Sequence, residues 1–102
     1  MKTIYKYVIS NIPDVVSGAN LSANLSLPVG AKILCCKVQK HVDVCVWVEL
    51  DTEVEQKENV FIAIYSTGFN MKQLEGREYK YIDTFMVGEG VYVYHVYAIK
   101  NW

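Results

Sequence analysis

The sequence lacks several features that mark exported, membrane-bound or nucleic-acid-binding proteins. Residues 1–10 hold no apolar core, so we expect no secretory signal peptide. No run approaches the roughly 18–20 apolar residues that a membrane span requires, so we expect no membrane partner. The net charge is −1 and no basic stripe is visible, which argues against binding of duplex nucleic acid. These absences predict a cytoplasmic protein.

Cysteine is scarce, and the chain holds only Cys35, Cys36 and Cys45. An odd number with two adjacent residues argues against a disulfide framework. The spacing of these cysteines with His41 faintly resembles a zinc site. However, neighbouring strand residues point to opposite faces, so Cys35 and Cys36 could not both bind one ion. We predict free, buried thiols, with no metal and no cofactor.

Motifs for catalysis are also missing, since neither a Walker motif nor GxGxxG occurs. Glu53, Glu55 and Glu58 fall in one acidic stretch, 51–59, whereas acid–base catalysis needs carboxyl groups in different environments. His95 lies in mid-strand among Tyr and Val, where a structural histidine, a ligand contact and a general base are all open. We predict that the chain is not an enzyme.

Apolar and aromatic residues are abundant instead. Hydrophobic residues make up 52% and aromatic residues 13% of the 102 residues. A chain of this length forms one domain, 1–102, and buries only roughly 60–65% of its unfolded surface. The surplus apolar residues must therefore lie in the core or in an exposed patch, and such patches usually mark interfaces. Self-association is expected on this ground alone.

The hydrophobic pattern has a period of two along most of the chain, which predicts about seven strands. Their spacing and the lack of a clear helix favour an all-β fold, either a single antiparallel β-sandwich or a partly open barrel. Only segment 69–78 could hold a short helical turn, and 51–59 is predicted to be a loop. The predicted strands are, in chain order, 3–9, 20–27, 31–39, 42–50, 60–66, 79–87 and 91–99.

Two of these strands are apolar on both faces. Segment 60–66 is therefore predicted to be a central strand. Segment 91–99 needs cover on both sides, one from the core and the other from a second subunit, because an uncovered strand of this kind would aggregate. Tight hairpins are predicted at Lys40-His41 and at 88–90.

The loop Ser66-Thr67-Gly68 directly follows the predicted central strand. Glycine allows close backbone approach, and the two hydroxyl groups could hold a phosphate or a base edge. An ordinary strand-ending turn is the alternative. Eight Tyr and two Trp could form core, interface or a stacking platform, where each stacked base contributes roughly 1–3 kcal/mol.

The whole chain resembles a family of small phage proteins in an ordered set of short motifs. These are Ile4-Tyr5-Lys6-Tyr7; Leu27-Pro28-x-Gly30-Ala31-x-Ile33-Leu34; Val38-Gln39 followed by a hairpin and Trp47; Tyr65-x-Thr67-Gly68; Tyr81-Ile82-x-Thr84-Phe85; and Val91-Tyr92-x-x-His95-Val96-Tyr97. Two positions depart from the family pattern. Ser66 stands where a Gly-Thr-Gly-like turn has Gly, and Asp83 stands where Gly is usual before Thr84.

That family is similar to the phage nucleotide sponges that counter cyclic-oligonucleotide (CBASS) immunity. The resemblance implies a non-catalytic homo-oligomer, with a tetramer favoured, in the cytoplasm of the infected bacterial host. It would bind cyclic dinucleotides such as cGAMP without cleaving them. The alternative is a phage structural or protein-interaction module with no nucleotide ligand. On the sponge hypothesis, the stacking rings are Tyr5, Trp47 and Tyr81, and the polar contacts are Lys6, Thr67, Gly68, Arg77 and His95.

Overall fold

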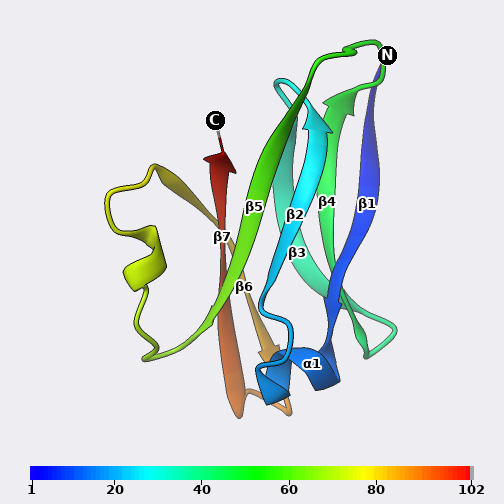
Figure 1. Cartoon of the computed structure of the whole chain (residues 1–102). Helices are drawn as coiled ribbons and strands as arrows, with labels where there is room; N and C mark the ends of the chain where they lie inside the picture. The colour runs from blue at the N-terminus through cyan, green and yellow to red at the C-terminus, as the bar shows by residue number, and fades with distance from the viewer. Residues whose placement is uncertain (102) are drawn as a thin grey trace.

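The computed structural model describes residues 1–101 and arranges seven strands in two antiparallel sheets, a β-sandwich (Figure 1). This confirms the predicted fold class. The three-stranded sheet has the order β1 (Lys2–Asn11), β4 (Asp43–Asp51), β3 (Lys32–Gln39). The four-stranded sheet has the order β2 (Ser22–Pro28), β5 (Lys57–Ser66), β7 (Tyr92–Asn101), β6 (Tyr79–Val87).

The main core lies between the sheets and follows from the alternation in each strand. Val44, Val46 and Val48 of β4 are fully buried, as are Ile62 of β5 and Val96 of β7. Burial of each such side chain contributes roughly 1.5–3 kcal/mol relative to exposure. β5 and β7 are both interior strands of their sheet, so the prediction of a central strand for 60–66 is confirmed.

A short helix, α1 (Ile12–Ser17), follows β1, which contradicts the expectation that helix could form only in 69–78. The Asn11 side chain accepts a hydrogen bond from the Asp14 N–H at 2.9 Å, and Gly18 ends the helix with φ of 80°. These are ordinary caps. The helix was missed because its six residues are too few to show a helical hydrophobic period.

The acidic loop is shorter than predicted. β4 continues through Asp51 and β5 begins at Lys57, so the loop comprises 52–56 rather than 51–59. Lys57 pairs with Pro28 and Glu58 with Leu27. Pairing with β2 thus extends β5 through residues that are too polar to read as a strand on their own.

Both predicted hairpins are present. In the first, Lys40 and His41 have φ of 56° and 61°, and the Val42 N–H donates to the Gln39 carbonyl at 3.2 Å. Two successive left-handed residues are typical of a type I′ turn, whose twist suits a hairpin. Val42, the first residue of the predicted strand 42–50, lies in this turn instead and is exposed.

The outer face of the four-stranded sheet carries a second, smaller hydrophobic cluster. Residues 67–78, which we call the cover segment, fold back over this face and include the short 3-10 helix η1 (Lys72–Leu74) (Figure 1). Leu74 is 3% exposed and belongs to a cluster with Ala63 and Ile99. Part of the β7 face for which a second subunit was predicted is therefore covered by the chain itself.

Asp83 joins the two sheets where β3 and β6 form their edges. Its Oδ2 accepts the Cys36 N–H at 3.0 Å and lies 3.1 Å from Lys37 Nζ, while Oδ1 accepts the Thr84 N–H at 2.8 Å. Burial alone would raise the pKa of Asp83, but the two N–H donors and Lys37 outweigh it and leave that pKa below its ordinary value.

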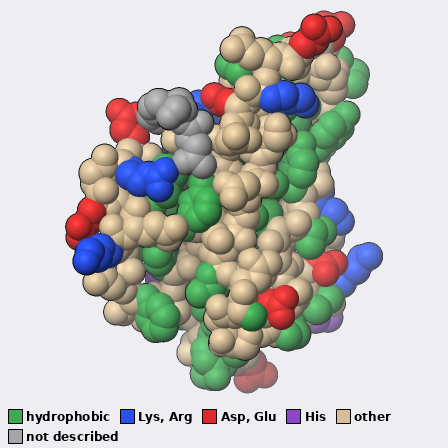
Figure 2. Space-filling model, viewed as in Figure 1, with side chains coloured by type: hydrophobic (Ala, Val, Ile, Leu, Met, Phe, Trp, Pro, Cys, Tyr) green, Lys and Arg blue, Asp and Glu red, His purple; other side chains and the backbone are tan. Residues whose placement is uncertain are grey.

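The surface shows no broad region of one charge on the face drawn in Figure 2, where basic side chains alternate with acidic ones. Within residues 1–101, no three His, Cys, Asp or Glu side chains group so as to hold a metal ion. In that same part of the chain, no helix has the length and apolar character needed to cross a membrane.

The thiol of Cys36 is fully buried between the sheets, and this burial raises its pKa to about 12.

Candidate ligand-binding site

The outer face of the four-stranded sheet gathers polar and aromatic side chains from three strands. His95 on β7 pairs with Tyr65 on β5 and with Thr84 on β6. Directly opposed residues of an antiparallel sheet point to the same side. Tyr81 and Tyr97 oppose each other in the next rank. The register therefore forms one continuous outer surface from these residues.

A chain of hydrogen bonds runs across this surface. Thr67 Oγ1 lies 2.8 Å from His95 Nε2, and His95 Nδ1 lies 3.1 Å from Thr84 Oγ1. Thr84 Oγ1 in turn lies 2.6 Å from the Tyr81 hydroxyl. Three residues singled out in the sequence, Thr67, Tyr81 and His95, are thus connected through one that was not, Thr84.

The chain of bonds can run in either direction because hydroxyl groups are both donors and acceptors. In one direction the Tyr81 hydroxyl donates to Thr84, Thr84 donates to His95 Nδ1, and His95 Nε2–H donates to Thr67. The Thr67 hydroxyl then donates to the Val93 carbonyl, at 3.5 Å. In the other direction Thr67 donates to Nε2 and Tyr81 keeps its proton for a further acceptor. Because both directions are possible, the hydroxyl groups of Thr67 and Tyr81 at the two ends can each donate to a ligand or accept from it.

Tyrosine rings flank this chain of bonds. The Tyr97 ring packs edge-to-face with Tyr65, Tyr79 and Tyr81, with centroid distances of 6.2, 5.5 and 5.7 Å. Tyr79 and Tyr81 remain 54% and 51% exposed. Tyr97 therefore holds two open rings in place, and held rings lose little further freedom when a ligand stacks on them.

Thr67 and Gly68 belong to the turn that ends β5. The Phe69 N–H donates to the Ser66 carbonyl at 3.1 Å, so the strand-ending turn considered from the sequence is present. Gly68 has φ of 89°, and a side chain there would meet no atom within 4 Å. Glycine is thus required by the backbone and not by crowding. The same turn also places the Thr67 hydroxyl against His95.

Arg77 lies at the end of the cover segment, and its positive charge acts on Tyr65. Burial raises the pKa of the Tyr65 hydroxyl, and Arg77 opposes that rise. The Tyr65 hydroxyl donates to Gln73 Oε1 at 3.1 Å, which fastens the cover segment to the sheet. Arg77 is therefore on the same outer side of the sheet as the series of hydrogen bonds Thr67–His95–Thr84–Tyr81, which we call the hydroxyl–imidazole chain.

The other three predicted site residues lie on the three-stranded sheet. Lys6 opposes Trp47, so both point to the outer face of that sheet, and Lys6 Nζ donates to Gln39 Oε1 at 2.7 Å. Tyr5 opposes the fully buried Val48 and so points to the other face. Within one chain, the structure does not bring Tyr5, Trp47 and Tyr81 together as a single stacking platform.

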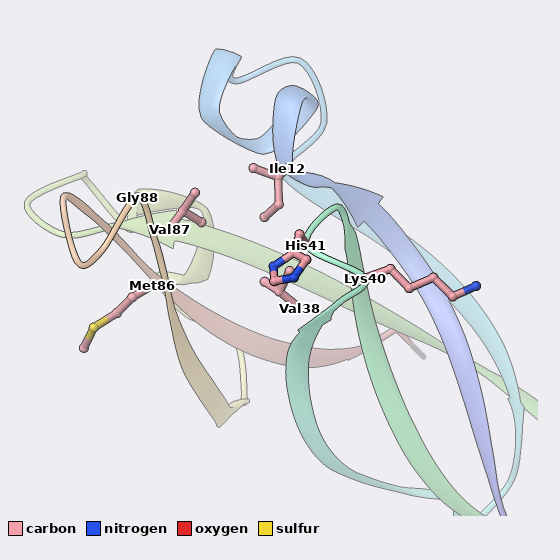
Figure 3. Close-up of a pocket in the computed structure, with 7 residues that line it drawn as sticks. All are labelled: Ile12, Val38, Lys40, His41, Met86, Val87 and Gly88. Atoms are coloured by element: carbon pink, nitrogen blue, oxygen red, sulfur yellow. The ribbon is translucent and has the colours of Figure 1, made fainter.

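A separate hollow of about 330 Å³ lies beside the first hairpin (Figure 3). His41 stands between Ile12 and Val38 there, while the Lys40 side chain extends away from it. Of the described side chains that line it, only those of His41 and Lys40 are polar. Ligand sites usually have several converging polar groups, so the outer face of the four-stranded sheet is the stronger candidate.

A family model described as a domain of unknown function, DUF7352, matches residues 1–101. The chain is a member of the DUF7352 family. No curated protein and no solved structure matches it. The family description names no ligand, so the chemistry of this DUF7352 protein has to be inferred from its own residues.

The DUF7352 chain pairs a hydroxyl with an imidazole, as nucleophilic enzymes do. In hydrolase triads a carboxylate holds the second ring nitrogen and stabilises the imidazolium. Here the Thr84 hydroxyl occupies that position. A hydroxyl can orient the His95 ring but supplies no compensating charge. The arrangement is therefore better suited to forming hydrogen bonds with a ligand than to activating Thr67.

Sequence reasoning missed Thr84 because an irregularity in β6 changes the face on which it lies. The register between β6 and β7 shifts between Tyr81 and Asp83. Without that bulge, Tyr81 and Thr84, three residues apart, would point to opposite faces. No local pattern in 79–87 marks the position of this bulge, so the sequence offered no signal for Thr84.

Proposed function

We propose that this DUF7352 protein is a phage immune-evasion protein that binds cyclic dinucleotides such as cGAMP and sequesters them without cleavage. The observation that carries the proposal is the chain Thr67–His95–Thr84–Tyr81, flanked by the open rings of Tyr79 and Tyr81. It would act in the cytoplasm of the infected bacterial host, as a homo-oligomer with a tetramer favoured.

The two kinds of group suit the two parts of such a ligand. The open tyrosine rings can stack on bases, at roughly 1–3 kcal/mol per base. The hydroxyl and imidazole groups can bond to phosphate oxygens or base edges. Arg77, on the same side, supplies a positive charge. Hydroxyl and imidazole groups that can either donate or accept also fit a protein that must hold its ligand intact.

The outer face of the four-stranded sheet would contact a ligand from one side only, whereas sequestration demands tight binding. A dissociation constant near 1 nM corresponds to about 12 kcal/mol. Two stacked bases and a few polar contacts reach that value only if the ligand is enclosed and the groups are held ready. We therefore expect a second copy of the chain to close over the ligand. Lys6 and Trp47, on the other sheet's outer face, are the predicted residues that such a copy could contribute.

Titration of the purified protein with cGAMP, followed by heat denaturation and chromatography of the released nucleotide, tests the proposal. We expect saturable binding and full recovery of intact cGAMP. At 100 times the dissociation constant, the ligand should add about 2.7 kcal/mol of stability. Hydrolysed nucleotide would instead indicate an enzyme that uses the Thr67–His95 pair. No binding of any cyclic dinucleotide would reject the proposal.

A tyrosine pair locates the site. Tyr81→Ala should weaken cGAMP binding at least about fivefold, because a stacked ring contributes roughly 1–3 kcal/mol. Tyr92→Ala is the matched control, since Tyr92 is 47% exposed but opposes the core-packed Val87 on the other side of β7. Equal losses in the two variants would move the site away from the hydroxyl–imidazole chain.

A protein-interaction module is the second candidate, and a different surface favours it. On the outer face of the three-stranded sheet, Ile4 and Leu34 are 54% and 42% exposed beside Trp47, around a shallow hollow. Exposed apolar patches commonly mark interfaces. Light scattering of the wild type and of Leu34→Glu separates the candidates. A complex that dissociates in the variant, with no nucleotide binding in either protein, would favour the interaction module.

A further inference from the structure

A second cavity, partly open to solvent, lies between the two sheets near the turn that joins β2 to β3. Its volume is about 250 Å³. The wall is aliphatic and comes from both sheets, with Leu27, Ile33, Val60 and Ile82 as its larger side chains. Small residues complete it, since Gly30, Ala31 and Ala98 also line the space and leave it unfilled.

Lys80 from β6 and Lys100 from β7 line this cavity from strand positions that oppose the core residues Ala98 and Val60. Lys32 of β3 also borders the cavity, but it opposes Glu49, so its side chain points to the outer face of the three-stranded sheet. Lys100 Nζ lies 3.3 Å from Glu58 Oε1, which is buried and has no hydrogen bond. Lys80 forms no ion pair with any residue in 1–101. One carboxylate against two ammonium groups leaves the cavity with one positive charge in excess.

We propose that this cavity binds a short amphipathic anion, with an aliphatic tail in the cavity and a phosphate or carboxylate head among the lysines. Aliphatic walls favour a chain over a nucleobase, and no aromatic ring is among the described residues that line the space. A cavity of about 150 Å³ accepts benzene, so this one has room for a tail of about eight carbons. Lysine ammonium groups recognise either head as point charges.

The site differs from the nucleotide site of the preceding proposal in place and in chemistry. Lys80 opposes Ala98, which packs toward the core, whereas Tyr81 opposes Tyr97 on the outer face. The two residues are neighbours in β6 but serve opposite sides of the sheet. Loss of one activity should therefore leave the other unchanged.

Calorimetric titration of the full chain with octyl phosphate and octanoate tests the proposal. Octanol tests the tail alone, and inorganic phosphate tests the head alone. We expect saturable binding of at least one of the two amphipathic anions. Octanol and inorganic phosphate should each bind at least about tenfold more weakly, because each retains only one of the two recognition elements. Equal affinities for octanol and octyl phosphate would overturn the role of the lysines.

Three variants assign the binding to this cavity. Lys80→Met keeps most of the aliphatic stem and should weaken octyl phosphate binding about three- to fivefold, as expected for a solvent-accessible ion pair. The double variant Lys80→Met and Lys100→Met should weaken it more than about tenfold, because both ammonium groups of the cavity are then gone. Lys72→Met, in η1 of the cover segment, is the matched control and should change nothing.

Ala98→Leu should fill the cavity and abolish binding of octyl phosphate while Lys80 and Lys100 both remain. Should this variant fail to fold, the double lysine variant decides alone, because its substitutions lie at the rim. Octyl phosphate affinity that survives both the double lysine change and a folded Ala98→Leu protein would overturn the proposal.

Discussion

The outer faces of the two sheets differ in how their apolar residues are protected. On the four-stranded sheet, Leu74 of the cover segment packs over Ile99, which is 1% exposed. On the three-stranded sheet, Ile4 and Val8 are 54% and 56% exposed. Both faces carry comparable apolar residues, so hydrophobicity along a strand does not determine which face is covered. Cover depends on the length and route of the loops.

The largest expected difference is in thiol labelling. Cys35 lines the shallow hollow beside Trp47 on the outer face of the three-stranded sheet, which we call the bare face. Cys36 points inward and is fully buried. Burial also raises the pKa of Cys36 to about 12, so its thiol remains protonated. Under brief iodoacetamide treatment, Cys35 should react at least about a thousandfold faster, because Cys36 reacts only through unfolding. Mass spectrometry of the digested chain measures both rates.

A leucine pair tests the stability of the two faces directly. Leu74→Ala should cost about 2–4 kcal/mol, since it removes a buried side chain from the second cluster. Leu34→Ala, on the bare face, should change the free energy of unfolding by no more than about 0.5 kcal/mol. Urea unfolding compares them. Similar losses would mean that the bare face is covered in solution.

Asp83→Asn tests the connection between the two sheets and should cost about 1.5–3 kcal/mol at neutral pH, because charged hydrogen bonds are lost. The lowered pKa of Asp83 means that the folded chain binds this proton less tightly than the unfolded chain. The carboxylate therefore stabilises the fold above its ordinary pKa of about 4, and this contribution declines as the pH falls toward the folded value.

The wild type and the Asp83→Asn variant should therefore converge in stability at acidic pH. Urea unfolding between pH 3 and pH 7 measures this convergence. Glu55→Gln, an exposed carboxyl in the 52–56 loop, is the control and should leave the stability little changed. A constant gap between wild type and Asp83→Asn across that pH range would contradict the assigned role.

The smallest expected effect concerns the fastening of the cover segment. Tyr65→Phe removes the hydrogen bond to Gln73 and keeps the ring, so it should cost about 0.5–1.5 kcal/mol. Hydrogen exchange should show faster opening in 67–78 with little change in the three-stranded sheet. Uniform acceleration across the chain would mean that the cover segment does not open independently.

The alternation of Val44, Val46 and Val48 was sufficient to predict a strand at 42–50, because a period of two is typical of a strand with one face on the core. A short helical turn was predicted within 69–78, which lies in the cover segment. The contact of this segment with Ile99 was not predicted, because local sequence does not specify which distant residues a loop packs against. Thr84 was missed because the bulge between Tyr81 and Asp83 places it on the face opposite to the one that strict alternation along β6 predicts. Within the candidate site, Thr67, Tyr81 and His95 were selected from the sequence, whereas their connection depends on long-range pairing.

Asp83 also has a consequence for how copies of this protein can meet. An edge strand normally offers unpaired N–H groups to any extended segment that approaches. The N–H of Cys36 on β3 is already occupied by a carboxylate from β6. A strand from another copy would have to displace this charged acceptor before it could pair with β3, so strand addition at the β3 edge is disfavoured. Assembly by strand addition is thereby directed to the opposite borders of the sandwich, which β1 and β2 provide.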